Sequence, residues 1–224
     1  MNGSEPCARG CRGFRRALLA LFLAAAQAPM PVFATTYEDF NRAVAMNDAG
    51  AVADLLRRGV DPQTANERGE MALFTAAREG SLETVKALLK GRAKVNVRNQ
   101  HGDSPIMVAA LNGHLPVVKA LRDAGAVINQ PGWTPLLYAV INGHEAVIDY
   151  LLSSGADVAS AAPNGTTAIM LATREHKSET VKLLLDYGFD FTARNEKGET
   201  ALMWARRDGF KDIESLLRTA GARE

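Results

Sequence analysis

The sequence predicts an all-α solenoid, in which one helical unit is repeated along the chain. Two observations support this prediction. Glycines separated by 33, 30, 33 and 33 residues open successive units, at Gly69, Gly102, Gly132, Gly165 and Gly198. Each of them is followed seven residues later by an alanine, at Ala76, Ala109, Ala139, Ala172 and Ala205. A period of this length is typical of solenoids, whose units bury their apolar faces only against their neighbours.

The composition fits a folded domain without a strong electrostatic field. Hydrophobic residues make up 47% of the 224 residues, charged residues make up 23%, and the formal net charge is +1. These values are ordinary for a globular protein. A nucleic acid or an anionic membrane surface is therefore not an expected partner.

The N-terminus has the pattern of a secretory signal. Four arginines precede an apolar run of 12 residues, 17–28, and prolines follow at positions 29 and 31. The run is shorter than the roughly 20 residues that span a bilayer. A basic segment, a short apolar segment and small residues describe a cleaved signal. We expect a signal peptide over 1–34, cleaved after Ala34, with Ala28 as the second candidate, and a mature domain over 35–224. Kept uncleaved, the segment would be a membrane anchor.

Cleavage would change the charge and the cysteine content. Residues 1–34 hold four arginines, one glutamate and both cysteines, so the mature chain has 22 basic and 24 acidic residues and a net charge of about −2. A cysteine-free chain needs no disulfides. With its alanine-rich signal, this favours a bacterial periplasm. Asn164-Gly165-Thr166 is a glycosylation sequon at an expected loop tip, which argues against a eukaryotic secretory route.

The motifs inside the units resemble a known family. Thr134-Pro135-Leu136-Leu137-Tyr138-Ala139 and Ser104-Pro105-Ile106-Met107-Val108-Ala109 open two of them. With the 33-residue period, the chain resembles the ankyrin-repeat family. The resemblance implies an array of about six helix-turn-helix units with β-hairpin or turn tips. The units are 36–68, 69–101, 102–131, 132–164, 165–197 and 198–224.

Each recurring position has a physical role. The opening glycine allows an unusual backbone angle in a turn. Threonine or serine caps the first helix, and proline suits its first position. The recurring alanine lets helices approach closely. A Gly-Ala pair is expected to end the second helix with a left-handed residue. A degenerate first unit has Ala43 and Gly59 at the corresponding places.

No residue pattern predicts catalysis, a metal site or a cofactor. His114 and His144 follow mid-unit glycines and are expected to fix the turn between helices, whereas His176 replaces such a glycine. The histidines lack paired metal-ligand spacing, and neither a nucleophile motif nor a phosphate loop is found. The carboxylates on the turns, Glu67, Glu70, Asp103 and Glu199, are expected to be solvated surface groups. We therefore expect a protein that is not an enzyme.

The resemblance implies that a partner binds to the loop tips and the inner face of the first helices. At these positions the end units are charged, while the central ones are neutral and apolar. We expect partner-binding residues at the centre: Trp133, Ile141, Leu111, Asn142, His101 and Asp103. The alternative is that Trp133 packs locally on Pro131 and Pro135. The fourth tip is three residues shorter than the others, so a regular hairpin is not expected there. Trp204 is expected in the core.

These observations predict an exported, monomeric module that binds another protein and no small-molecule substrate. One alternative is an inhibitor or immunity-type protein that blocks a secreted enzyme. A second is a scaffold tethered to the membrane by an uncleaved signal. A third is an enzyme with a site that no motif reveals, because a fold alone does not decide function.

Overall fold

The computed structural model of the protein describes residues 32–223. The chain divides into two compact units, Met1–Thr36 and Tyr37–Glu224, and the repeats belong to the second. The expected signal peptide therefore lies almost wholly outside the described residues. Its expected end, Ala34, is in the first turn of helix α2 (Val32–Ala45).

Residues 32–223 form twelve helices and no strand, which confirms the all-α solenoid. The first helices of the repeats are α2 (Val32–Ala45), α4 (Ala72–Arg78), α6 (Pro105–Leu111), α8 (Pro135–Asn142), α10 (Ala168–Arg174) and α12 (Ala201–Asp208). The second helices are α3 (Ala49–Arg57), α5 (Leu82–Lys90), α7 (Leu115–Asp123), α9 (Glu145–Ser153), α11 (Ser178–Asp186) and α13 (Lys211–Thr219). None of the described helices is long and apolar enough to cross a membrane.

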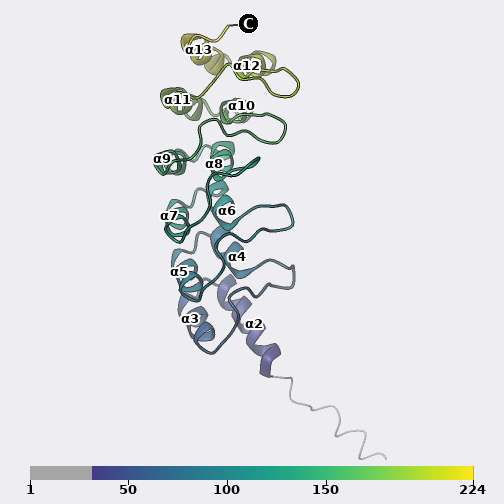
Figure 1. Ribbon diagram of the computed structural model, residues 1–224, viewed down its shortest axis with the longest axis vertical. Helices are drawn as coiled ribbons and strands as arrows, with labels where there is room; N and C mark the ends of the chain where they lie inside the picture. Colours follow the sequence, from purple (N-terminus) through teal and green to yellow (C-terminus); the bar gives the residue numbers. More distant parts are fainter. Residues whose placement is uncertain (1–31, 224) are drawn as a thin grey trace, which may run out of the picture. The chain divides into compact units, whose positions relative to one another are not determined.

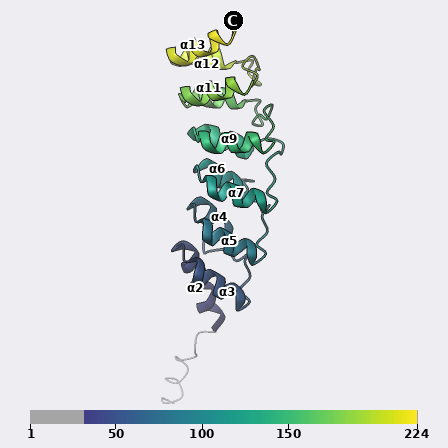
Figure 2. The same cartoon turned by 90° about the vertical axis from the view of Figure 1, so that its left-hand side faces the viewer.

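Within the unit Tyr37–Glu224, the helices form two parallel rows. Figure 1 shows the second helices on one side, the first helices beside them, and the loop tips projecting beyond the first helices. The view turned by 90° shows successive second helices lying one above the next (Figure 2). The row of first helices and tips is called the inner face below, and the row of second helices the outer face.

The loop tips are turns, and the expected β-hairpins are not formed as strands in the described part of the chain. Two tips carry a single isolated antiparallel bridge, Ala65 with Met71 and Ala161 with Thr167. The shortened fourth tip has only bends at residues 131–133, as its length predicts. It projects less than its neighbours in Figure 1.

The core runs through every repeat. The recurring alanines are completely buried: Ala76, Ala109, Ala139, Ala172 and Ala205. Second-helix residues such as Val85, Leu121 and Leu151 are also inaccessible to solvent and join the same apolar cluster. Trp204 is only 7% exposed, which confirms its expected place in the core. The small alanines leave space for adjacent first helices to approach, because protein interiors are close-packed.

A left-handed residue joins the two helices of every repeat. The six equivalent positions are Asn47, Gly80, Gly113, Gly143, His176 and Gly209. Histidine therefore does replace glycine in the fifth repeat, with φ of 51°. Nε2 of His114 lies 2.8 Å from the carbonyl oxygen of Arg78, and Nε2 of His144 lies 2.9 Å from that of Leu111. Both histidines thus bind the preceding repeat, which confirms their structural role.

The second repeat departs from the expected helix ending. Elsewhere a glycine is left-handed at this place, as Gly125 and Gly155 are. In the second repeat the glycine comes one residue earlier. Gly91 has φ of −73°, and the residue after it, Arg92, is left-handed with φ of 66°. A Cβ built on Gly91 would lie 2.8 Å from Cδ1 of Leu56 in the preceding repeat. Glycine is placed where the neighbouring repeat comes close, and arginine adopts the strained conformation.

Helix starts follow the expected capping chemistry. The Thr134 hydroxyl accepts a hydrogen bond from the backbone N–H of Leu137, and Thr200 accepts one from Met203. Pro135 occupies the first position of α8, where its missing N–H costs nothing.

Candidate partner-binding surface

On the inner face of the second repeat, three charged side chains form ion pairs with one another. Arg78 forms ion pairs with Glu70, from the tip, and with Glu79, next to it in the chain. The hydrogen bond and charge of Glu70 raise the pKa of Arg78. Thr75 also donates to the Glu70 carboxylate, at 3.2 Å. This repeat offers a partner little uncompensated charge.

The sixth repeat has the same arrangement, and the fifth has the arginine and its neighbouring glutamate but Thr166 in place of the tip carboxylate. Arg207 pairs with Asp208 at 2.8 Å and with Glu199, from its own tip, at 3.4 Å. A hydrogen bond from Asn195 and the charge of Arg207 lower the pKa of Glu199. Arg174 pairs with Glu175 at 2.8 Å.

In the central repeats apolar residues occupy the same positions. The places of Arg78 and Arg207 are taken by Leu111 in the third repeat and Ile141 in the fourth. Trp133 stands at the position that Glu70 occupies in the second repeat and Glu199 in the sixth. The fourth repeat therefore carries a tryptophan–isoleucine pair in place of a glutamate–arginine pair.

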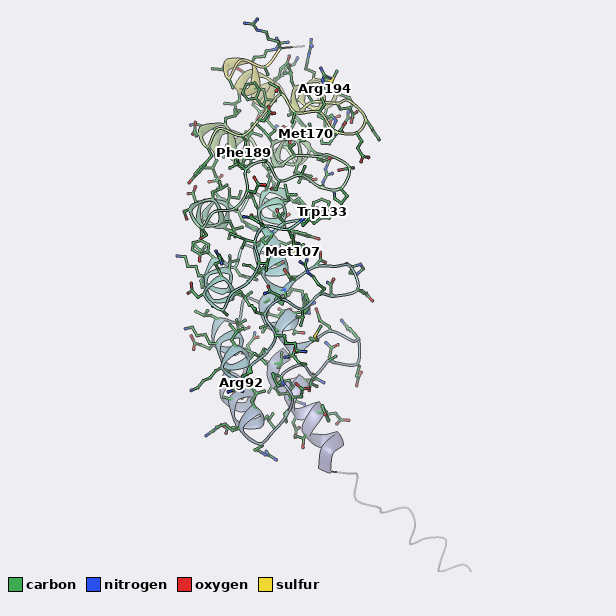
Figure 3. All side chains as sticks on the ribbon, in the orientation of Figure 1. Arg92, Met107, Trp133, Met170, Phe189 and Arg194 are labelled. Atoms are coloured by element: carbon green, nitrogen blue, oxygen red, sulfur yellow. The ribbon has the colours of Figure 1, made fainter. Side chains whose placement is uncertain are left out.

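Trp133 packs against the repeat that carries it. Its ring is partly buried against the core, and its centroid lies 5.5 Å from that of Tyr138, with the planes tilted by 54°. The Trp133 carbonyl accepts a hydrogen bond from Nε2 of Gln130 at 2.5 Å. Figure 3 labels Trp133 on the side of the loop tips. Ring separations of this size are favourable for aromatic pairs, so Trp133 is held in place before any partner arrives.

Tyr138 connects the tryptophan to the third repeat. Its hydroxyl donates a hydrogen bond to the carboxylate of Asp103, which also accepts one from Nδ2 of Asn99 at 3.2 Å. Burial, and then the hydrogen bond to Asp103, raise the pKa of Tyr138 well above its ordinary range. The structure thus links Asp103 to Trp133 through Tyr138, across a repeat boundary.

A second connection joins Leu111 and Asn142. Nδ2 of Asn142 donates to the Leu111 carbonyl at 2.7 Å, on the oxygen that His144 also contacts. Asn142 is exposed, whereas Leu111 and Ile141 are partly buried. His101 is exposed at the third tip, and its ring nitrogen lies 3.3 Å from Nε2 of Gln100. No contact recorded for the described residues joins His101 to the other five expected residues.

The shortened tip leaves a hollow between the fourth and fifth tips. Its volume is about 440 Å³, and its lining comprises Asn129, Gln130, Pro131, Gly132, Thr134, Asp157, Ser160 and Ala161. The three missing residues of the fourth tip explain why it is open. It borders the tip that carries Trp133.

The expectation that the turn carboxylates are merely solvated is wrong for three of them. Glu70, Asp103 and Glu199 are each partly buried. They bind Arg78, Tyr138 and Arg207 respectively. Glu70 and Glu199 are reached by an arginine of their own repeat, whereas Asp103 is reached by Tyr138 of the next repeat.

Sequence reasoning did not single out three residues that hold this surface together. Tyr138 lies within the motif Thr134–Ala139, and the sequence predicts only that it is part of a helix. Arg98 donates to Gln130 and to the Gly102 carbonyl, so it ties the third tip to the fourth.

Residues 32–223 contain no group of three or more histidine, cysteine or carboxylate side chains placed to hold a metal ion. The described surface consists of apolar rings and aliphatic side chains, neutral amides and internally paired charges.

Comparison with known proteins agrees with this structure. A family model described as ankyrin repeats in three copies matches residues 40–132, 96–162 and 158–223. No curated protein matches the chain. The matched segments together extend over nearly all of the described repeats, and they coincide with the helix pairs and tips reported above. The chain belongs to the ankyrin-repeat family.

Proposed function

We propose that this protein is an exported adaptor of the bacterial periplasm that binds one partner protein through the centre of its inner face. Ankyrin repeats are modules that bind other proteins. The single observation that supports this location is the replacement of the glutamate–arginine pair by Trp133 and Ile141. Tryptophan is enriched among the residues that dominate binding energy, near the centre of interfaces.

The charges on the inner face favour a protein partner over a nucleic acid. The arginines at the recurring positions, Arg78, Arg174 and Arg207, are each paired with carboxylates of their own repeats. A nucleic-acid surface would need unpaired cations for the phosphates. An apolar centre with a polar, charged rim is the usual anatomy of a protein interface.

The binding proposal is tested with Trp133→Ala in the full chain, expressed in its own cells and purified from the envelope. We expect one protein that co-purifies with the wild type to be lost from the variant. Tyr187→Ala is the matched control, because it removes an aromatic ring, 44% exposed, from the outer face. Both variants must unfold at denaturant concentrations close to the wild type. A partner retained by Trp133→Ala would place the binding site elsewhere.

Export is tested on the same material. Mass spectrometry of the intact purified protein should show a chain that begins at Thr35 or, with the second cleavage candidate, at Pro29. An intact N-terminus in envelope material would instead support the tethered scaffold.

A further inference from the structure

A second surface lies on the outer face, between the second helices of the first two repeats. A groove of about 470 Å³ is lined by Ala53, Leu56 and Arg57 from α3, and by Ala87, Lys90 and Gly91 from α5 and its end. The small side chains of its lining leave room beside the partly buried Leu56. A groove of this volume holds a few side chains, which suits a short segment of a partner.

The backbone around this groove is unusual for the chain. In the other repeats a left-handed glycine follows the residue that ends the helix. Here Gly91 ends the helix, and Arg92 takes the left-handed conformation with φ of 66°. A left-handed conformation is strained for a residue that carries a side chain. Strain kept at a surface is a reason to look for function there. As a result Gly91, which has no side chain, lines the groove, and the cationic Arg92 follows it in the chain.

The groove has both paired and unpaired cations around it. Arg57 pairs with Asp54, and Lys86 pairs with Glu83. Within the described residues, Lys90, which lines the groove, has no ion pair or hydrogen bond through its side chain, and neither do Arg58 and Arg92, which follow lining residues in the chain. Figure 3 labels Arg92 beside the outer row of helices.

These cations are confined to the first two repeats. At the positions of Lys90 and Arg92, the third repeat has Asp123 and Gly125, and the fifth has Asp186 and Gly188. An occupant with negative charge would be attracted here and repelled from the equivalent places further along.

We propose that this groove is a second docking site, which takes an amphipathic helical segment of a partner protein that has acidic residues beside its apolar face. The apolar side chains would enter between Leu56 and Ala87, and the carboxylates would meet Lys90 and Arg92. An amphipathic helix in an apolar groove is a recurrent mode of peptide recognition. The site lies on the face opposite to Trp133, so the protein would hold two partners at once.

The test uses the full chain and two fluorescein-labelled amphipathic peptides. They have identical leucines on one face, and the flanking positions carry glutamate in one peptide and glutamine in the other. Fluorescence anisotropy should show saturable binding of the glutamate peptide and binding at least about tenfold weaker for the glutamine peptide. Binding should also weaken as salt is raised, because exposed charges are screened.

Three variants locate the site. Lys90→Glu should weaken binding of the glutamate peptide by at least about tenfold, because a rim cation becomes an anion. Arg92→Gly should also weaken it, and it should raise the midpoint of urea unfolding because the left-handed strain is relieved. Lys182→Glu is the control, since Lys182 is an exposed cation on the outer face of the fifth repeat and should leave binding unchanged.

Several results would overturn the proposal. Equal affinity for the two peptides would remove the charge selectivity on which it rests, and no binding of the glutamate peptide would remove the site. Binding of phosphatidylglycerol vesicles without binding of the peptide would identify the groove as a membrane contact instead. Trp133→Ala should leave peptide binding unchanged, so this site and the inner-face site can fail independently.

Discussion

The imidazole of His144 fills the space that a side chain on Gly113 would need. A Cβ built on Gly113 would lie 2.5 Å from Nδ1 of His144, and the same ring contacts the Leu111 carbonyl through Nε2. Gly80 and His114 repeat this relationship one unit earlier, at 2.6 Å. The glycine is therefore required both for its backbone angle and for the histidine of the next repeat.

Gly113→Ala should destabilise the protein more than Gly209→Ala. Both glycines are left-handed, with φ of 73° and 76°, so alanine at either place costs about 1–2 kcal/mol of unfolding free energy. Nothing lies within 4 Å of a Cβ on Gly209. At Gly113 the ring of His144 must also move and lose its hydrogen bond, which adds about 1 kcal/mol. Urea unfolding of the two variants measures the difference, and equal losses would contradict the role assigned to His144.

Tyr138→Phe should uncouple the third and fourth repeats at the inner face. The variant leaves the partly buried Asp103 without its phenol donor, and the expected loss is about 1 kcal/mol of unfolding free energy. A double-mutant cycle with Asp103→Asn isolates the interaction. Additive losses in that cycle would show that the hydrogen bond contributes nothing.

The coupling energy between Tyr138 and Asp103 should depend on pH in the alkaline range. The pKa of Tyr138 is raised in the folded protein by burial and by Asp103. A raised pKa means that the stabilisation is complete below the ordinary tyrosine value of about 10 and is lost only as pH rises towards the folded value. The coupling energy from the cycle should therefore stay constant between pH 6 and 9, and a decline within this range would contradict the assignment.

Asp212 should contribute to stability in a window of acidic pH. Hydrogen bonds from Ser178 and then from His176 lower its pKa to about 2. A lowered pKa means that the stabilisation is complete above the unfolded value of about 3.9 and is lost as pH falls towards the folded value. The stability difference between the wild type and Asp212→Asn should shrink as the pH falls from 4 to 2.

Ser178→Ala provides the internal test of that assignment. The Ser178 hydroxyl is the main cause of the lowered pKa, so its removal should raise the pKa of Asp212, as followed by NMR of the side-chain carboxyl. An unchanged titration would mean that His176, stacked on Phe210 with ring centroids 4.0 Å apart, controls the carboxylate alone.

Several features could be predicted because they repeat. The close-packed Ala139, the replacement of a turn glycine by His176 and the structural role of His144 follow from a position in a period, whose role is the same in each unit. The bends of the fourth tip followed from a three-residue deletion. Trp133 was recognisable as a candidate because it occupies a place that is charged in other repeats.

The sequence by itself determined the repeat, the helix pairs and their core, because local spacing and burial set these features within one unit and its neighbours. Only the tertiary structure decided how side chains of different repeats pair. It joined Tyr138 to Asp103, and it brought Leu56 against Gly91 so that Arg92 became the left-handed residue. Such contacts depend on the distance and angle between stacked repeats, which arise from the packing of the whole array.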